Sequence, residues 1–89
     1  MPKKENLLAK LFATRLPRSF TTNDLDALMR YCNCEKTPGG RGSAISYYHL
    51  PTKRILRFDG PHPENTLYAY QVKMVRNFLI EIGEYERMD

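Results

Sequence analysis

Two histidines, His49 and His62, are the side chains in this sequence that exchange a proton most readily near neutral pH. Cleavage of RNA without a metal ion uses such a group, either as the general base for the 2′-hydroxyl or as the general acid for the leaving 5′-oxygen. His49 stands at the end of an expected strand, and His62 is held between Pro61 and Pro63 in an extended corner. Histidines in such places are more often structural or surface residues than catalysts.

Basic and aromatic residues are the second chemical feature of the chain. Its 14 Lys and Arg exceed its 10 Asp and Glu, which gives a net charge of +4 and a pI near 9.2 and suits a polyanionic partner. Tyr47 and Tyr48 stand among the cations, and such rings can stack bases while the charges contact phosphates. A solvated basic surface with half-buried tyrosines is the alternative. The candidate RNA contacts, at the expected sheet, its turns and the proline corner, are Lys36, Arg41, Ser43, Lys53, Arg54, Arg57 and His62.

A glycine-rich turn at residues 38–43 precedes one of the expected strands. Its backbone N–H groups can bind a phosphate in a nest that ends at Ser43. It is not a P-loop, because it lacks the Gly-Lys-Ser/Thr ending and leads into a strand rather than a helix. A hairpin turn that requires glycine is the more common reason for such a sequence.

Metal, disulfide and membrane chemistry are not expected. No cluster of carboxylates indicates a metal-dependent nuclease, and no Ser or Cys has a histidine and an acid arranged around it. Cys32 and Cys34 are too close for an ordinary disulfide and have no nearby histidine for a zinc site, so we expect reduced thiols. No apolar run approaches the ~20 residues of a membrane span, and the charged N-terminus lacks the apolar segment of a signal peptide. We expect a cytoplasmic protein without a cofactor.

The order of the expected elements predicts the fold class. After a leading helix within residues 5–16, the chain should run helix, three strands, helix across residues 20–83. This order is typical of an α+β domain, with a three-stranded antiparallel sheet and two helices on one face. The leading helix either docks on the core by its leucines or serves as a contact arm for a partner. All 89 residues form one domain; the core helices are expected at 22–32 and 65–82, and the strands at 35–37, 44–50 and 53–58.

Local signals predict where the two core helices begin and end. Thr21 and Asp24 form a capping box before the first, Asn65 or Thr66 can cap the second, and Gly83 can end it. The residues expected to be buried are Leu25, Leu28, Leu56, Phe58, Leu67, Met74, Val75 and Phe78.

A set of residues at fixed spacing spans most of the chain. Behind the capped helix come a Gly-Ser pair at a strand start, a proline corner, and a helix whose pattern ends at a glycine. The set is Gly42, Ser43, Tyr47, Pro61, His62, Pro63, Leu67, Gln71, Val75, Phe78, Leu79 and Gly83. Over residues 20–83 this pattern resembles the HicA family of toxins from bacterial toxin–antitoxin systems.

The resemblance implies a core similar to a double-stranded-RNA-binding domain, a metal-independent endoribonuclease that cleaves mRNA (an mRNA interferase), and a HicB-type antitoxin protein that covers the active surface. In the family the catalytic histidine directly follows the Gly-Ser pair. Here that position holds Ala44, and a methyl group cannot transfer a proton. We therefore expect an inactivated variant. The alternatives are a natural divergent member that uses His49, His62 or no histidine, and a non-catalytic binder of RNA or of a partner.

A double-stranded-RNA-binding module without catalysis is the rival function. Such a module contacts phosphates with a cluster of Lys and Arg at the start of its last helix. The segment that opens the expected last helix, residues 63–67, carries Glu64 and no base, which counts against this rival.

Overall fold

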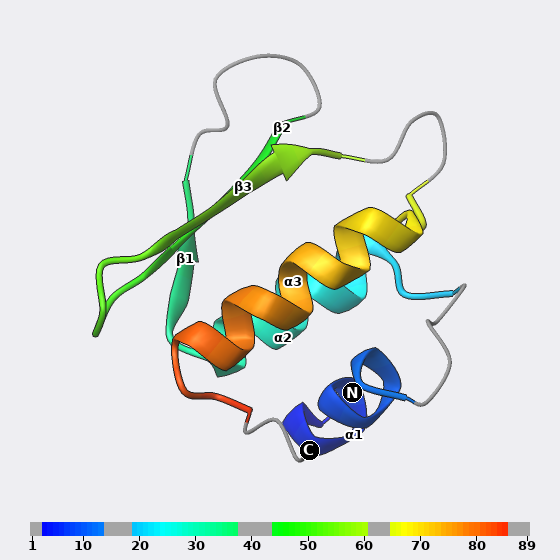
Figure 1. Ribbon diagram of the computed structural model, residues 1–89, viewed down its shortest axis with the longest axis horizontal. Coiled ribbons are helices and arrows are strands. Elements are labelled where there is room, and N and C mark those ends of the chain that lie inside the picture. Colours follow the sequence, from blue (N-terminus) through cyan, green and yellow to red (C-terminus); the bar gives the residue numbers. More distant parts are fainter. Residues whose placement is uncertain (1–2, 14–18, 38–43, 61–64, 86–89) are drawn as a thin grey trace.

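A three-stranded antiparallel sheet forms one side of the molecule (Figure 1). The computed structural model describes residues 3–13, 19–37, 44–60 and 65–85. Strand β2 lies between the other two and pairs with both in antiparallel fashion. The strands are β1 (Cys34–Lys36), β2 (Ala44–His49) and β3 (Ile55–Asp59).

Two helices cover one face of this sheet side by side, and a third lies beyond them. Helices α2 (Thr22–Tyr31) and α3 (Ala69–Glu81) pack beneath the sheet, and α1 (Lys4–Leu11) lies on the side of this pair that is remote from the sheet (Figure 1). The predicted α+β fold, with an antiparallel sheet and both core helices on one face, is confirmed. Within the described part of the chain, no helix has the length and apolar character needed to cross a membrane.

Helix α2 begins at the predicted capping box, and α1 docks on it. Thr21 Oγ1 accepts a hydrogen bond from the Asp24 N–H, and Asp24 Oδ2 accepts one from the Thr21 N–H, each at 3.1 Å. The Lys10 ammonium of α1 lies 2.9 Å from the same oxygen. Burial raises the pKa of Asp24, but its hydrogen bonds to Lys10 and Thr21 outweigh that cost and hold the pKa below its usual value.

A short backbone bridge ties the starts of α2 and α3 together. Thr21 pairs with Thr66, and the Thr22 N–H donates to the Asn65 carbonyl at 2.8 Å. Both helices therefore begin at the same end of the molecule and run in the same direction (Figure 1).

The core lies between the sheet and the helix pair and continues to α1. Leu7 and Leu11 bring α1 into it, so this helix docks by its leucines. Phe12 stacks on Tyr85 with ring centroids 3.6 Å apart, which holds the helix against the C-terminal segment. The other buried apolar residues are Phe20, Leu25, Leu28, Met29, Cys32, Cys34, Tyr47, Leu56, Phe58, Leu67, Val72, Val75, Phe78, Leu79 and Ile82.

The predicted start of the last helix is wrong by one turn. Asn65 and Thr66 are used by the bridge to α2, so neither caps a helix, and α3 begins at Ala69. The predicted burial of Met74 is also wrong, because its side chain is 37 % exposed. Met74 lies outside the buried face of α3, which consists of Gln71, Val72, Val75, Phe78 and Leu79. Arg76 of the same helix reaches α1, where its Nε donates to the Leu11 carbonyl at 2.6 Å.

Other predicted boundaries shift by a few residues. Helix α1 ends at Leu11, well before residue 16, and residues 14–18, including Pro17, lie outside the described residues. Strand β3 begins at Ile55 because Lys53 takes a left-handed turn conformation, with φ of +63°. The prediction that Gly83 ends the last helix is confirmed, since its φ is +82° directly after the C-cap.

Replacing Phe78 by alanine should severely destabilise the domain. Its side chain is buried on α3, and truncation of a buried Phe costs roughly 3–5 kcal/mol out of the roughly 5–15 kcal/mol of a typical domain. Thermal unfolding followed by circular dichroism measures this loss. Tyr70→Ala, which removes an exposed ring from the same helix, is the control and should cost less than about 0.5 kcal/mol. Equal melting shifts in the two variants would mean that the packing of α3 described above is wrong.

Candidate functional site

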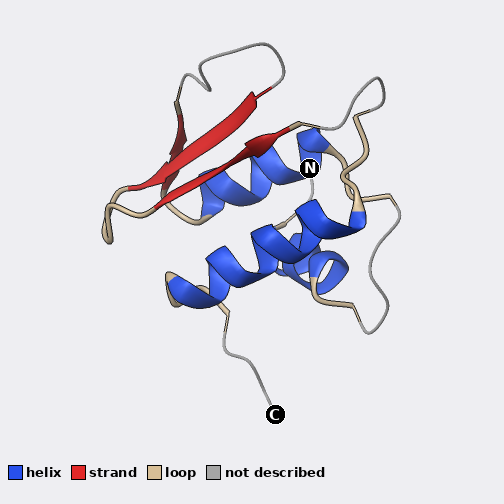
Figure 2. Ribbon diagram, turned by 45° about the horizontal axis from the view of Figure 1, so that its top comes forward, coloured by secondary structure: helices blue, strands red, loops and turns tan. Residues whose placement is uncertain are grey.

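The outer face of the sheet is the surface that the helices leave uncovered (Figure 2). Successive side chains of a strand point to opposite faces, and Tyr47 points into the core. Ala44, Ser46 and Tyr48 therefore lie on the outer face of β2, and the register places Arg57 beside Ser46 on the same face. Position 44 opens onto this surface at the first residue of the central strand.

An acid and a base of β3 are the cross-strand neighbours of position 44. Asp59 is the direct partner of Ala44, and Arg57 is the partner of Ser46, one diagonal step away. Directly opposite Cβ atoms are about 4.5–5.5 Å apart, and diagonal neighbours about 7–8 Å. A side chain at position 44 thus has a carboxylate and a guanidinium within reach. The sequence pattern indicated the arginine but not Asp59, because the register of the hairpin decides which residues meet.

A hydrogen-bonded pair holds the β1 side of this face. The Thr37 hydroxyl lies 2.8 Å from the Ser46 hydroxyl, and the Thr37 N–H donates to the Ser46 carbonyl at 2.9 Å. These two hydrogen bonds fix the polar groups of Thr37 and Ser46 at the β1 side of the outer face.

The predicted cations of the β2–β3 turn lie far from position 44. Lys53 and Arg54 stand at the opposite end of the hairpin, about 16 Å from Ala44 at the rise of a strand. Arg54 Nη1 is 3.4 Å from Glu81 Oε2, so this arginine is paired with α3. They can contact an RNA strand only if it runs along the whole hairpin.

Lys36 also lies away from the outer face. Its strand partner is Tyr47, so the lysine is on the helix side of the sheet, at the exposed edge of β1. There it lines a hollow of about 370 Å³ together with Asp26 and Arg30. The Tyr47 hydroxyl closes this hollow by donating to Asp26 Oδ1 at 3.2 Å. Burial, then the Asp26 charge, raises the pKa of Tyr47, so this phenol stays protonated and is a poor acid at neutral pH.

Three predicted site residues, Arg41, Ser43 and His62, lie outside the described residues. Their segments adjoin the site in sequence, since residues 38–43 lead directly into Ala44 and residues 61–64 follow Gly60 at the end of β3. Of the predicted site, the structure brings together Ala44 and Arg57.

His49 is a buried part of the β2–β3 hairpin. Its ring is 3 % exposed, and Nδ1 lies 2.7 Å from the Thr52 hydroxyl. The backbone closes the same turn, because the Lys53 N–H donates to the His49 carbonyl at 2.7 Å. The alternation of β2 puts His49 on the face opposite to Ala44. It therefore holds the turn and does not reach the outer face.

Gln71 links the end of β3 to the start of α3, a role that the sequence pattern did not indicate. Its side chain is fully buried. Nε2 donates to the Asp59 carbonyl, and Oε1 accepts from the Tyr68 N–H at 2.7 Å. The same side chain thus holds the backbone of the residue opposite position 44 and the first free N–H of the helix. A polar residue within an apolar helix face was the signal that could have revealed this.

The two cysteines carry no chemistry in this state. Both are buried and reduced. Burial, reinforced by the Glu84 charge, raises the pKa of Cys32 to about 12 and that of Cys34 to about 11, so neither forms a thiolate at neutral pH. Among the described residues, no group of His, Cys, Asp and Glu is arranged to hold a metal ion.

Comparison with known proteins identifies no relative: no protein-family model, no curated protein and no solved structure matches the chain.

Replacing Gln71 by leucine should lower the free energy of unfolding by about 1–3 kcal/mol for each backbone group that loses its partner. Leucine has nearly the same volume, but it cannot bond the Asp59 carbonyl or the Tyr68 N–H. Urea unfolding measures the change, and Asn77→Leu, the same kind of substitution at an exposed position of α3, is the control. A Gln71→Leu domain as stable as the parent would show that this link is dispensable.

Proposed function

We propose that this chain is a HicA-type toxin of a bacterial toxin–antitoxin system, in which mRNA lies across the outer face of the sheet. The observation that carries the proposal is the place of position 44. The residue directly after the Gly-Ser pair stands on the open face of the central strand, with Asp59 opposite and Arg57 diagonal to it. The α-β-β-β-α order of the core supports the same reading, because it is the order that the family resemblance implies.

A histidine at position 44 would have the chemical partners that metal-independent RNA cleavage needs. An imidazole has an ordinary pKa near 6.5 and can donate or accept a proton at neutral pH. The Asp59 carboxylate opposite favours the protonated ring, which suits a general acid for the leaving 5′-oxygen. The Arg57 guanidinium would stabilise the negative charge that develops on the phosphate.

The chain as written binds RNA without cleaving it. Ala44 supplies no proton, and His49 is buried on the other face of the sheet. In this proposal the protein works in the cytoplasm without a cofactor, its substrate class is mRNA, and a HicB-type antitoxin covers the outer face. Arg57 contacts phosphates near position 44, while Lys53 and Arg54 contact them further along the strand.

Ala44→His should convert this chain into an active ribonuclease. A positioned general acid or base typically contributes 10²–10⁴-fold to a rate, so we expect at least about a hundredfold faster loss of full-length mRNA. The measurement is RNA integrity over time with the purified proteins, together with growth of the host after induction. Ala44→Gln adds a polar side chain that transfers no proton at neutral pH and is the control.

Two outcomes would contradict the proposal. If the Ala44 chain already degrades RNA and Ala44→His adds nothing, position 44 is not the catalytic position. Activity in Ala44→Gln equal to that of Ala44→His would also exclude proton transfer at this place.

A further inference from the structure

Two exposed tyrosines stand together at the start of α3. Tyr68 is the N-cap and Tyr70 lies in the first turn. Their ring centroids are 6.2 Å apart and the ring planes meet at 32°. Tyr68 is 44 % exposed and Tyr70 56 %. An isolated exposed tyrosine is ordinary, but a pair leaves a continuous aromatic surface in solvent.

A chain of contacts places this pair at the same end of the molecule as position 44. Ala44 is the strand partner of Asp59, the Asp59 carbonyl accepts from Gln71 Nε2, and the same Nε2 lies 3.4 Å from the Tyr70 hydroxyl. Two residues, Gln71 and Asp59, thus connect Tyr70 to the proposed catalytic position.

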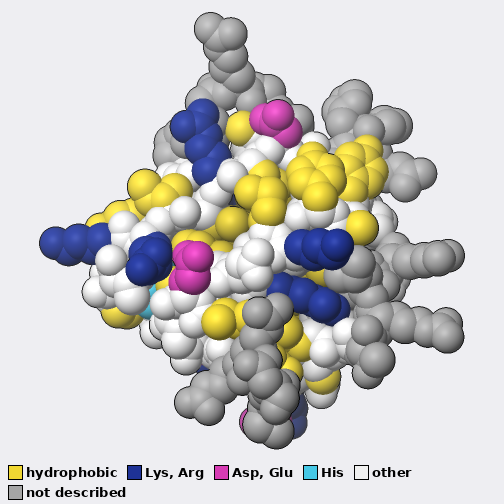
Figure 3. All heavy atoms as spheres, in the orientation of Figure 1, with side chains coloured by type: hydrophobic (Ala, Val, Ile, Leu, Met, Phe, Trp, Pro, Cys, Tyr) yellow, Lys and Arg dark blue, Asp and Glu magenta, His cyan; other side chains and the backbone are white. Residues whose placement is uncertain are grey.

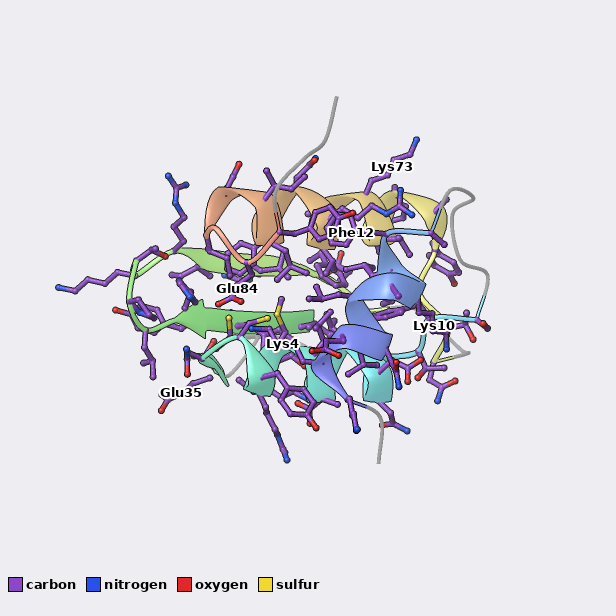
Figure 4. All side chains as sticks on the ribbon, turned by 90° about the horizontal axis from the view of Figure 1, so that it is seen from below. Lys4, Lys10, Phe12, Glu35, Lys73 and Glu84 are labelled. Atoms are coloured by element: carbon purple, nitrogen blue, oxygen red, sulfur yellow. The ribbon has the colours of Figure 1, made fainter. Side chains whose placement is uncertain are left out.

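One cation, Lys73, accompanies the two tyrosines on α3. Lys73 follows one turn after Tyr70 and points away from α3 into solvent (Figure 4). On this side of the molecule, cations and exposed apolar side chains lie next to each other (Figure 3). The first turn of α3 has no acid, and Glu81 lies at the other end of the helix. A polyanion that reaches the rings meets no carboxylate in the first turn of α3, and on its way to position 44 it passes Asp59, the strand partner of Ala44.

We propose that Tyr68 and Tyr70 form a stacking platform for unpaired bases of single-stranded RNA, whose phosphates continue past Arg57 to position 44. The proposal rests on the proposed function and adds the class of substrate. Bases of a duplex are stacked on each other and cannot lie on a protein ring, whereas splayed bases of a single strand can. The platform therefore selects single-stranded over double-stranded segments and holds the nucleotides beside the scissile phosphate.

A protein contact is the competing use of this surface, because Tyr and Met are enriched at protein interfaces and Met74 is exposed one turn further on. The Lys73 cation and the short connection to position 44 favour RNA. The RNA affinity of a variant that lacks one ring separates the two uses.

The test is fluorescence anisotropy with two labelled oligonucleotides of equal length at low salt, one a single-stranded RNA and the other a chain of abasic sites with the same phosphates. The Ala44 chain is used, since it binds without cleavage. Its variants are Tyr70→Ala, Tyr70→Phe, which keeps the ring, and Tyr31→Ala, which removes a similarly exposed ring at the end of α2. Circular dichroism checks that each variant is folded.

Stacking on a ring is lost with the ring, so Tyr70→Ala should weaken RNA binding about fivefold or more. Tyr70→Phe and Tyr31→Ala should bind as the parent does, and all four proteins should bind the abasic chain equally. Equal RNA affinity of the parent and Tyr70→Ala would overturn the stacking platform while leaving the proposed function intact. It would favour a protein contact at Tyr68 and Tyr70 instead. A parent that binds neither oligonucleotide would overturn the proposed function itself.

Discussion

Both polar atoms of the buried Gln71 side-chain amide form hydrogen bonds, and the arrangement of the candidate site depends on them. Nε2 donates to the carbonyl of Asp59, the last residue of β3, and Oε1 accepts from the N–H of Tyr68, the N-cap of α3. A buried amide left without partners costs free energy, so this geometry is strongly preferred. It fixes where the sheet meets the helix, and with it the distance between position 44 and the exposed tyrosines.

The two faces of the sheet explain why the described site is small. One face supplies Tyr47, Leu56 and Phe58 to the core, and His49 is buried with them. The other face carries Ala44, Ser46 and Arg57. Because side chains alternate, every second side chain of β2 points toward the core, where it stabilises the fold and cannot contact a ligand on the outer face. Within β2, the side chains that contact a ligand on the sheet must therefore come from the outer face.

Part of this fold could be predicted from local sequence signals. The capping box of Thr21 and Asp24 and the end of α3 at Gly83 each depend on a few neighbouring residues, and each was found where it was expected. The three strands were also found, with ends that differ from the expected ones by one or two residues. The start of α3 depends on a contact with a distant segment, the bridge between Thr21 and Thr66. No local pattern reveals such a contact.

The candidate site was less predictable for the same reason, because the strand register decided which charged side chains lie near position 44. It brought Arg57 near position 44, added Asp59, and left Lys36 on the other face.

The most direct test of RNA binding on the outer face is a nitrogen–proton correlation spectrum of the Ala44 chain, recorded during titration with single-stranded RNA. The account predicts that the amide signals of Ala44, Ser46, Arg57 and Tyr70 shift together as RNA is added, and that those of α1 stay in place. Shifts confined to the hollow lined by Asp26, Arg30 and Lys36, or no shifts at low salt, would contradict it.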